Sequence, residues 1–230
     1  FVLKCDGSNL SSVLKQIWDV DLPRDFLRWQ GFDNDKVETK VAPYREHCRR
    51  AILDFIRSLP EQDIAGLDFL TEPRGGVMVQ LIETFGGEER ACDAALLSDG
   101  TLRTLSVAAA MFSAGQENLV VIEEIDNGVH PSRAHHLLSR IQAIAEEHKL
   151  RVLLTTHNPA LLDALPDVAV PHAVFCYRDP EDGSSRLVRL SDLPDYPELI
   201  AQGPLGHLLT SGVIDRFVKH HPGPEERKRK

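Results

Sequence analysis

The stretch LVVIEEIDNGVHP, residues 119–131, combines a short apolar run with a cluster of polar and acidic residues. Four apolar residues, typical of a buried strand, run directly into two adjacent carboxylates, Glu123 and Glu124. A carboxylate at a strand end suits Mg²⁺, which prefers oxygen ligands and keeps waters and phosphate oxygens in its shell. Because side chains alternate along a strand, the second carboxylate points elsewhere and can hold a water. Taken alone, the pair is equally consistent with an ordinary polar loop.

Strands and helices alternate on both sides of this stretch. We expect strands at 119–122, 151–155 and 172–177, and helices at 102–112, 131–148 and from Asn158 onward. Strands that are apolar throughout and alternate with helices predict an α/β fold with a parallel sheet buried on both faces. In such sheets ligands bind beyond the carboxyl ends of the strands, which is where Glu123–Glu124 and Thr156–His157 lie.

The first part of the chain follows a different pattern. Apolar residues at helical spacing predict helices over 10–18 and 44–59. Two strand-like runs, 64–70 and 77–85, flank the segment Glu72–Gly76, which is a good turn signal for a β-hairpin. Gly86 and Gly87 are expected to close the second strand.

A second polar stretch, LLSDGTLR at residues 96–103, precedes a helix rich in small residues. Free backbone N–H groups and the helix dipole make such an end an anion site, and the Ser98 hydroxyl adds a donor. The alternative is that Ser98 or Asp99 is an ordinary N-cap.

A third stretch, LLTTHNPALLDALP at residues 153–166, places His157 just beyond an apolar strand. A histidine there can donate a hydrogen bond to a phosphate oxygen. The alternative is a histidine that neighbours a helix N-terminus and binds no ligand.

Taken together in this order, the three stretches resemble the C-terminal lobe of ABC-type ATPases related to SMC and RecF proteins. The resemblance is greatest to the bacterial AAA-family or OLD-like ATPases, many of which belong to phage-defence operons and others to DNA repair. The segment DGSNLSSVLKQI, residues 6–17, is similar to this group as well.

The resemblance implies a role for each matching residue. Ser98, Asp99 and Gly100 match the signature motif, which contacts the γ-phosphate of ATP held by the partner subunit. Glu123 would help to hold Mg²⁺, and Glu124 would be the catalytic glutamate that orients or deprotonates the attacking water. Asp126 and Asn127 fall in the D-loop, which communicates across the dimer, and His157 would reach the γ-phosphate. The implied cofactors are ATP and Mg²⁺, and the implied partners are a second copy in a homodimer or higher oligomer, a nuclease effector and DNA.

One departure from the family pattern concerns the phosphate cradle, G-x-x-x-x-G-K-[ST], because the sequence contains no Gly-Lys dipeptide. In this family the cradle precedes every motif seen here. We therefore expect the chain to be the C-terminal part of such an ATPase, with the P-loop on an N-terminal segment that is removed or separate. The alternative is a degenerate protein that has lost the cradle. The expected division is the end of an N-terminal core segment at 1–20, a helical insertion at 21–60, the C-terminal lobe at 61–220, and a disordered basic tail at 221–230.

Composition limits the function classes that the chain can serve. The sequence has 230 residues, with 35 acidic and 26 basic side chains, for a net charge of −9. A surface of that sign repels nucleic acid on average, so a DNA contact would need a local basic patch. The four cysteines form no CxxC pair, which fits a reducing cytoplasm and argues against a zinc ribbon. No apolar run approaches the roughly 20 residues that span a bilayer, and no signal peptide is visible.

Two other functions compete with the ATPase. The missing cradle favours an ATPase-fold scaffold that docks an effector without hydrolysis, whereas the paired glutamates with His157 oppose it. A metal-dependent nuclease could use Glu123, Glu124, Asp126 and His130, since acidic clusters can bind two metals. That reading leaves the signature-like segment and His157 unexplained.

Overall fold

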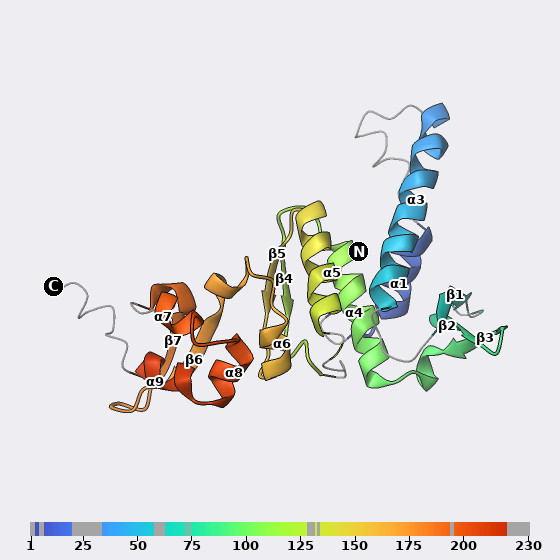
Figure 1. The fold of residues 1–230 in the computed structure, drawn as a ribbon. Coiled ribbons are helices and arrows are strands. Elements are labelled where there is room, and N and C mark those ends of the chain that lie inside the picture. Colours follow the sequence, from blue (N-terminus) through green and yellow to red (C-terminus); the bar gives the residue numbers. More distant parts are fainter. Residues whose placement is uncertain are drawn as a thin grey trace. The chain divides into compact units, whose positions relative to one another are not determined.

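The computed structural model describes residues 3–4, 7–19, 34–57, 63–71, 73, 75–127, 132, 134–193 and 196–219 (Figure 1). The chain divides into two compact units, a first unit of Phe1–Thr155 and a second unit of Thr156–Lys230. None of the described helices combines the length and the apolar character that crossing a membrane requires. The predicted basic tail at 221–230 lies outside the described residues.

The described residues at the start of the first unit include helices α1 and α3. Helix α1, Leu10–Asp19, confirms the helix predicted over 10–18. Helix α3, Asn34–Ile56, begins ten residues before the predicted start and contains Pro43. This early start was not predicted, because a proline normally interrupts a helix and residues 34–43 are mostly polar. Helix α3 lies within the predicted insertion at 21–60, a division of the chain that stays a prediction.

An antiparallel sheet follows in the order β1-β2-β3, with β1 at Ile64–Thr71, β2 at Val77–Phe85 and β3 at Glu88–Asp93. The predicted hairpin is confirmed, because Thr71 pairs with Val77 across the turn. Strand β3 was not predicted. Gly86 and Gly87 both have positive φ and form a tight turn that leads into β3, so they do not end the sheet. The sequence did not reveal β3 because its residues are mostly charged and exposed and show no alternation of apolar and polar residues.

The core of the first unit packs α1, α3 and the β1–β3 sheet against helix α4, Asp99–Ser113. Ile52, Ile56, Val79, Leu81 and Leu105 are all fully buried in this cluster. Complete burial of such a side chain stabilises a fold by roughly 1.5–3 kcal/mol. This core therefore holds α4, and with it Ser98, in a defined place.

The first unit also contains strand β4, Leu119–Ile122, helix α5, Ala134–Glu147, and strand β5, Arg151–Leu154. Strands β4 and β5 pair in parallel, from Leu119 opposite Arg151 to Ile122 opposite Leu154. The predicted parallel sheet is confirmed in this pair. Its parallel direction brings the carboxyl ends of both strands to the same edge.

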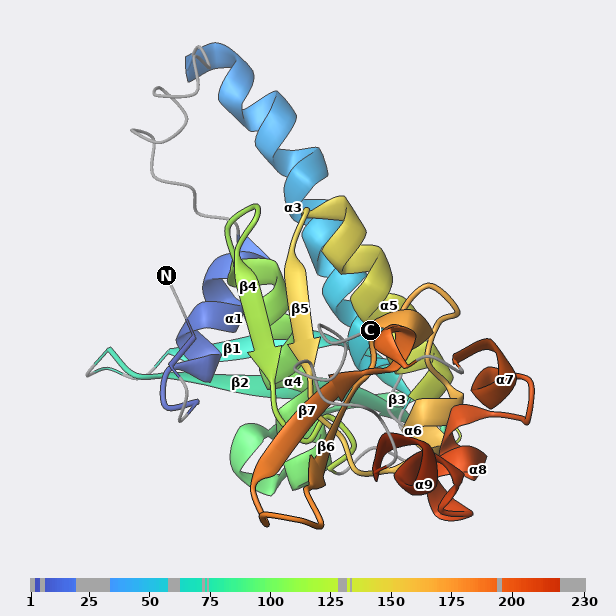
Figure 2. The same cartoon turned by 90° about the vertical axis from the view of Figure 1, so that its left-hand side faces the viewer.

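The prediction that these strands are buried on both faces is wrong for the described chain. Val120 and Ile122 are each 7% exposed, but Leu119, Val121 and Leu153 are 54%, 53% and 52% exposed. Helices α4 and α5 lie on one side of the β4–β5 pair (Figure 2). No described element of the first unit covers the three exposed side chains, so the sheet presents an apolar face.

Among the described residues, the second unit contains a hairpin and short α-helices. The strands are β6, Val174–Arg178, and β7, Ser185–Arg189, and the helices are α6, Pro159–Asp163, α7, Tyr196–Ile200, α8, Leu205–Thr210, and α9, Val213–Lys219. The strand predicted at 172–177 exists, but it pairs antiparallel with β7 and does not join β4 and β5. Its assignment to the parallel sheet was wrong, because β6 forms a hairpin with β7 across residues 179–184, a connection that is too short for a parallel crossover.

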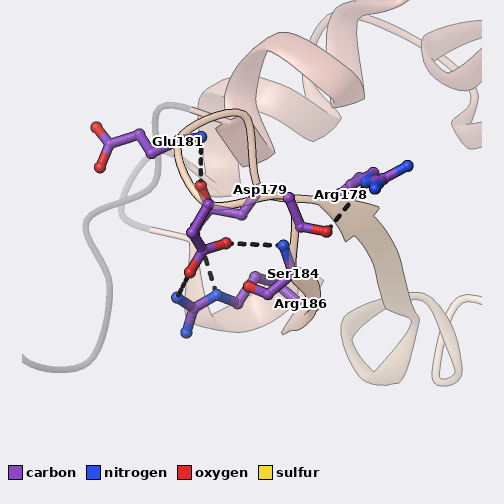
Figure 3. Close-up of polar contacts among 7 residues, drawn as sticks. Arg178, Asp179, Glu181, Ser184 and Arg186 are labelled. Carbon is purple, nitrogen blue, oxygen red and sulfur yellow. Dashed lines mark hydrogen bonds and ion pairs between the residues drawn. The ribbon is translucent and has the colours of Figure 1, made fainter.

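The tip of this hairpin is closed by polar contacts (Figure 3). The Asp179 carboxylate accepts a hydrogen bond from the Glu181 N–H at 2.9 Å. It also forms an ion pair with Arg186, in which Nε and Oδ2 are 3.4 Å apart. Hydrogen bonds from Ser184, together with the nearby Arg186, lower the pKa of the Asp182 carboxyl. The contacts of Asp182 therefore stabilise the tip at neutral pH and are lost as the pH falls through the lowered pKa of this carboxyl.

Helices α6 and α8 touch at Gly206. The Gly206 N–H donates to Asp163 Oδ1 at 2.6 Å, and a Cβ added at Gly206 would lie 2.0 Å from the Pro159 carbonyl oxygen. Only a glycine allows this approach without moving the backbone.

We predict that Gly206→Ala destabilises the second unit by about 1–3 kcal/mol, because the new methyl group must displace the backbone of α6. Chemical denaturation measures the change. The matched control is Gly66→Ala, whose added Cβ would meet no atom closer than Ile82 Cγ1 at 4.0 Å. Equal stability of the two variants would contradict the packing described.

A second prediction concerns the start of α4. Ser98 is the N-cap, and its hydroxyl accepts the Thr101 N–H at 3.2 Å. Ser98→Ala is expected to lower the free energy of unfolding by about 1 kcal/mol, because that N–H loses its acceptor. Ser106→Ala is the control on the same helix, since the Ser106 hydroxyl only donates back to the Leu102 carbonyl. If Ser106→Ala lowers the free energy of unfolding as much as Ser98→Ala does, the stabilising role of the Ser98 cap is contradicted.

Candidate functional site

The turn that carries Glu123 and Glu124 begins where strand β4 ends, at Ile122. Both side chains are exposed. Glu124 has a φ of 47°, in the left-handed region that residues other than glycine seldom occupy. Conformations of this kind cluster at functional sites and persist only where surrounding contacts enforce them.

Contacts from the end of β5 enforce the conformation of this turn. The Thr155 N–H donates to the Ile122 carbonyl at 3.0 Å, and the Thr155 carbonyl accepts the Ile125 N–H at 3.1 Å. The Thr155 hydroxyl accepts the Glu124 N–H at 2.9 Å. Thr155 therefore contacts the turn with its backbone and with its side chain.

The residues predicted for the D-loop lie in the same turn. Asn127 donates from its side-chain amide to Glu124 Oε2 at 2.7 Å, and its backbone N–H donates to the Glu124 carbonyl at 3.0 Å. Asp126, in contrast, is only 9% exposed. The structure thus brings Asn127 against the Glu124 carboxylate and withdraws Asp126 from the surface.

A basic side chain reaches the turn from helix α4. The Arg103 guanidinium donates to the backbone carbonyl of Glu123, and the Arg103 Nε is buried without a hydrogen-bond partner among the described residues. This contact uses the Glu123 backbone, so the Glu123 carboxylate stays available to a ligand. Helix α4 thereby connects the Ser98 end of the helix to the strand end that bears Glu123.

The signature-like residues lie at the start of α4. Ser98 caps the helix, its hydroxyl lies 2.8 Å from that of Thr101, and the exposed Asp99 occupies the first turn. Gly100 is buried, and its carbonyl accepts the Thr104 hydroxyl at 3.0 Å. The N-cap reading of Ser98 is confirmed, and the binding of a phosphate at this end stays a prediction.

His157 belongs to the second unit and precedes helix α6. Its side chain is exposed. The next residue, Asn158, caps α6 by accepting the Ala160 N–H at 3.0 Å, and the Thr156 hydroxyl accepts the Asn158 N–H at 3.0 Å. His157 therefore follows the strand end as predicted, and its contact with a phosphate stays a prediction.

The donor groups at this turn fit Mg²⁺ better than a metal held by protein alone. Within the described ranges, the structure gathers no group of three or more His, Cys, Asp or Glu side chains that could hold a metal. Mg²⁺ is commonly bound through one or two carboxylates, with water and substrate phosphates as the other ligands. The exposed Glu123 carboxylate meets that requirement. The two-metal nuclease gains no support here, and His130 lies outside the described residues.

Sequence reasoning assigned no role to two residues that shape this site, Arg103 and Thr155. Arg103 lies one and a half helical turns beyond Ser98 in LLSDGTLR, where a long basic side chain could have suggested a reach toward a strand end. Thr155 is a hydroxyl residue at the end of an apolar strand. Nothing in its local pattern shows that it accepts from a residue 31 positions earlier.

Comparison with solved structures finds partial likenesses to SMC ATPase heads. One is an SMC ATPase studied for ATP-driven dimerization and DNA-stimulated activation, with 15% identity, a TM-score of 0.43, and coverage of 67% of this chain and 89% of that one. Another is an Smc head bound to the C-winged helix domain of ScpA, with 13% identity, a TM-score of 0.44, and coverage of 79% and 53%. A third, from Pyrococcus furiosus, is an Smc head with an extended coiled coil bound to the C-terminal domain of ScpA, with 16% identity, a TM-score of 0.41, and coverage of 86% and 54%. No curated protein matches the chain.

A family comparison is more decisive. Residues 8–163 match the family described as "AAA domain, putative AbiEii toxin, Type IV TA system". The matched region contains helix α4, the β4–β5 pair and the Glu123–Glu124 turn, and it ends at the last residue of α6. The fold of this region is α/β, and it contains the parallel β4–β5 pair. Because the match spans well over half of the sequence, the chain belongs to this family of AAA-domain ATPases.

Proposed function

We propose that this chain is the C-terminal lobe of an ABC-type ATPase, which binds and hydrolyses ATP at a composite site between two subunits. The single observation that best supports the proposal is the Glu124 turn. Within the region that matches the family, an exposed carboxylate lies at the end of a parallel strand in a left-handed conformation enforced by Thr155 and Asn127. Glu117 and Lys149 share this backbone conformation but precede β4 and β5, whereas Glu124 follows the carboxyl end of β4, the edge at which parallel sheets bind ligands.

The two glutamates would have separate roles in ATP hydrolysis. Glu123 would hold Mg²⁺, which neutralises phosphate charge when it is bound. Glu124 would orient the attacking water or take its proton. Asn127 engages Oε2 of that carboxylate, which leaves Oε1 to accept a hydrogen bond from the water.

The other motif residues would complete the site in the assembled enzyme. Ser98, Asp99 and Gly100 would face the γ-phosphate of ATP held by the partner subunit, where the N-terminus of α4 favours an anion. Asp126 and Asn127 would communicate across the dimer. His157 would donate a hydrogen bond to the γ-phosphate.

We propose that the segment that carries the P-loop covers the exposed face of the β4–β5 pair. Three apolar side chains, Leu119, Val121 and Leu153, are about half exposed on this face. An apolar strand or helix of a P-loop-bearing segment would bury them, and it would place its phosphate cradle near the edge where Glu123 and Glu124 lie. The sequence itself has no Gly-Lys dipeptide and therefore no such cradle.

ATP binding and turnover would control a partner, which we propose to be a nuclease effector or DNA in a cytoplasmic defence or repair system. The net charge of −9 means that DNA would contact a local basic surface and not the chain as a whole. The missing cradle also supports a second function, in which the fold docks an effector and does not hydrolyse ATP.

Glu124→Gln separates these two functions. In the assembly that contains the P-loop, this variant is expected to lose at least about 100-fold in ATP turnover, because the amide cannot take a proton from water. ATP binding should change less than about threefold, since Glu124 would act on the water and not on the nucleotide. Turnover is measured by phosphate release and binding by equilibrium titration with a fluorescent ATP analogue.

The control is Glu89→Gln, which makes the same chemical change at an exposed position on β3. It should keep the turnover of the unchanged protein. Glu124→Gln with normal turnover would refute the role of Glu124. Absence of turnover in the unchanged assembly, with ATP binding retained, would favour the scaffold.

A further inference from the structure

We propose that Thr155 is a positioning residue, whose hydroxyl fixes the backbone of Glu124 so that the carboxylate meets the attacking water. This inference rests on the proposed function, because it concerns the same reaction. It adds a residue to which no motif of the sequence assigns a role. Thr155 would touch neither the nucleotide nor the water and would act only through Glu124.

The turn needs an anchor from outside its own sequence. Strand β4 ends at Ile122, and the backbone bonds of Thr155 that continue its pairing meet Ile122 and Ile125, so they do not hold the Glu124 N–H itself. Its φ of 47° is a conformation that a glutamate leaves readily unless other contacts hold it. The backbone N–H of Glu124 is held by one described hydrogen bond, which it donates to the Thr155 hydroxyl at 2.9 Å.

Thr155 can serve as this anchor because two backbone hydrogen bonds fix its own position. Its N–H donates to the Ile122 carbonyl, and its carbonyl accepts the Ile125 N–H. These bonds fix the backbone of Thr155 on both sides of Glu124. The β-branched side chain then has few rotamers, so the hydroxyl is held in a defined place.

Asn127 does not replace this contact. It lies three residues after Glu124 and belongs to the same turn, so it moves together with the glutamate that it contacts. Thr155 comes from the end of the neighbouring strand, 31 positions away in the sequence. Thr155 therefore sets the turn relative to the sheet, whereas Asn127 sets the carboxylate relative to the turn.

The Thr155 contact is solvent-exposed, which separates its effect on position from its effect on folding. Water can replace the hydroxyl as an acceptor, so its loss should leave the fold intact. Water cannot hold the left-handed backbone in one place. Since small misplacements of a catalytic group lower a rate steeply, the loss should appear in turnover.

The test compares Thr155→Val, which keeps the shape but removes the acceptor, with Thr155→Ser, which restores the hydroxyl. In the ATPase assembly with its P-loop, Thr155→Val is expected to lower kcat at least tenfold and to leave KM within about twofold. Thr155→Ser should recover kcat to within about threefold of the unchanged protein. Thr210→Val, which removes a hydroxyl bonded to helix carbonyls on α8, is the matched control with unchanged turnover.

A second readout does not depend on ATP. Hydrogen exchange at the Glu124 amide, followed by NMR, should be faster in Thr155→Val than in Thr155→Ser. Equal exchange rates would overturn the inference. Normal kcat in Thr155→Val would also overturn it, and so would an equal loss of kcat in both variants. An unchanged assembly that hydrolyses no ATP would instead mean that the proposed function has failed, and the inference with it.

Discussion

The parallel pairing of β4 with β5 is the constraint on which the rest of the candidate site depends. Because both strands run in the same direction, Ile122 and Leu154 are opposite each other, and the chain leaves both strands at one edge. The hydrogen bonds of Thr155 continue this pairing into the turn and meet the backbone of Ile122, Glu124 and Ile125. A shift of one residue in this register would point Glu124 and Thr155 to other faces and remove the contact between them.

Helix α4 packs in the core of the first unit and also contacts this edge of the sheet. Leu105 and Ala109 bury the helix against the cluster built from α1, α3 and the antiparallel sheet. The same helix is capped by Ser98 at its start and donates from Arg103 to the Glu123 carbonyl. A rigid helix therefore joins the residues expected to meet a partner subunit's nucleotide to the strand end expected to hold Mg²⁺. In the proposed dimer, this gives a physical route by which one composite site could sense the other.

The sequence predicts well what depends on local pattern. Apolar runs and turn residues indicated α1, the β1–β2 hairpin, β4, α5 and β5, and the order of the motifs indicated the family. What it could not predict depends on contacts made elsewhere in the chain. Strand β3 is highly charged, α3 continues through Pro43, and β6 pairs with a neighbour in a hairpin. Arg103 and Thr155 act through backbone atoms of residues distant in sequence, which no local pattern reveals.

The composite ATP site is tested by measuring ATP turnover by this chain alone, and again after addition of the P-loop-bearing polypeptide of the same system. We expect no turnover by the chain alone and Mg²⁺-dependent turnover in the mixture, because Glu124 and His157 would act on a nucleotide cradled by the other segment. Turnover by the chain alone would contradict the inference that its ATP site needs a phosphate cradle from another segment. Absence of turnover in both, with the mixture assembled and ATP bound, would contradict hydrolysis and leave the scaffold function.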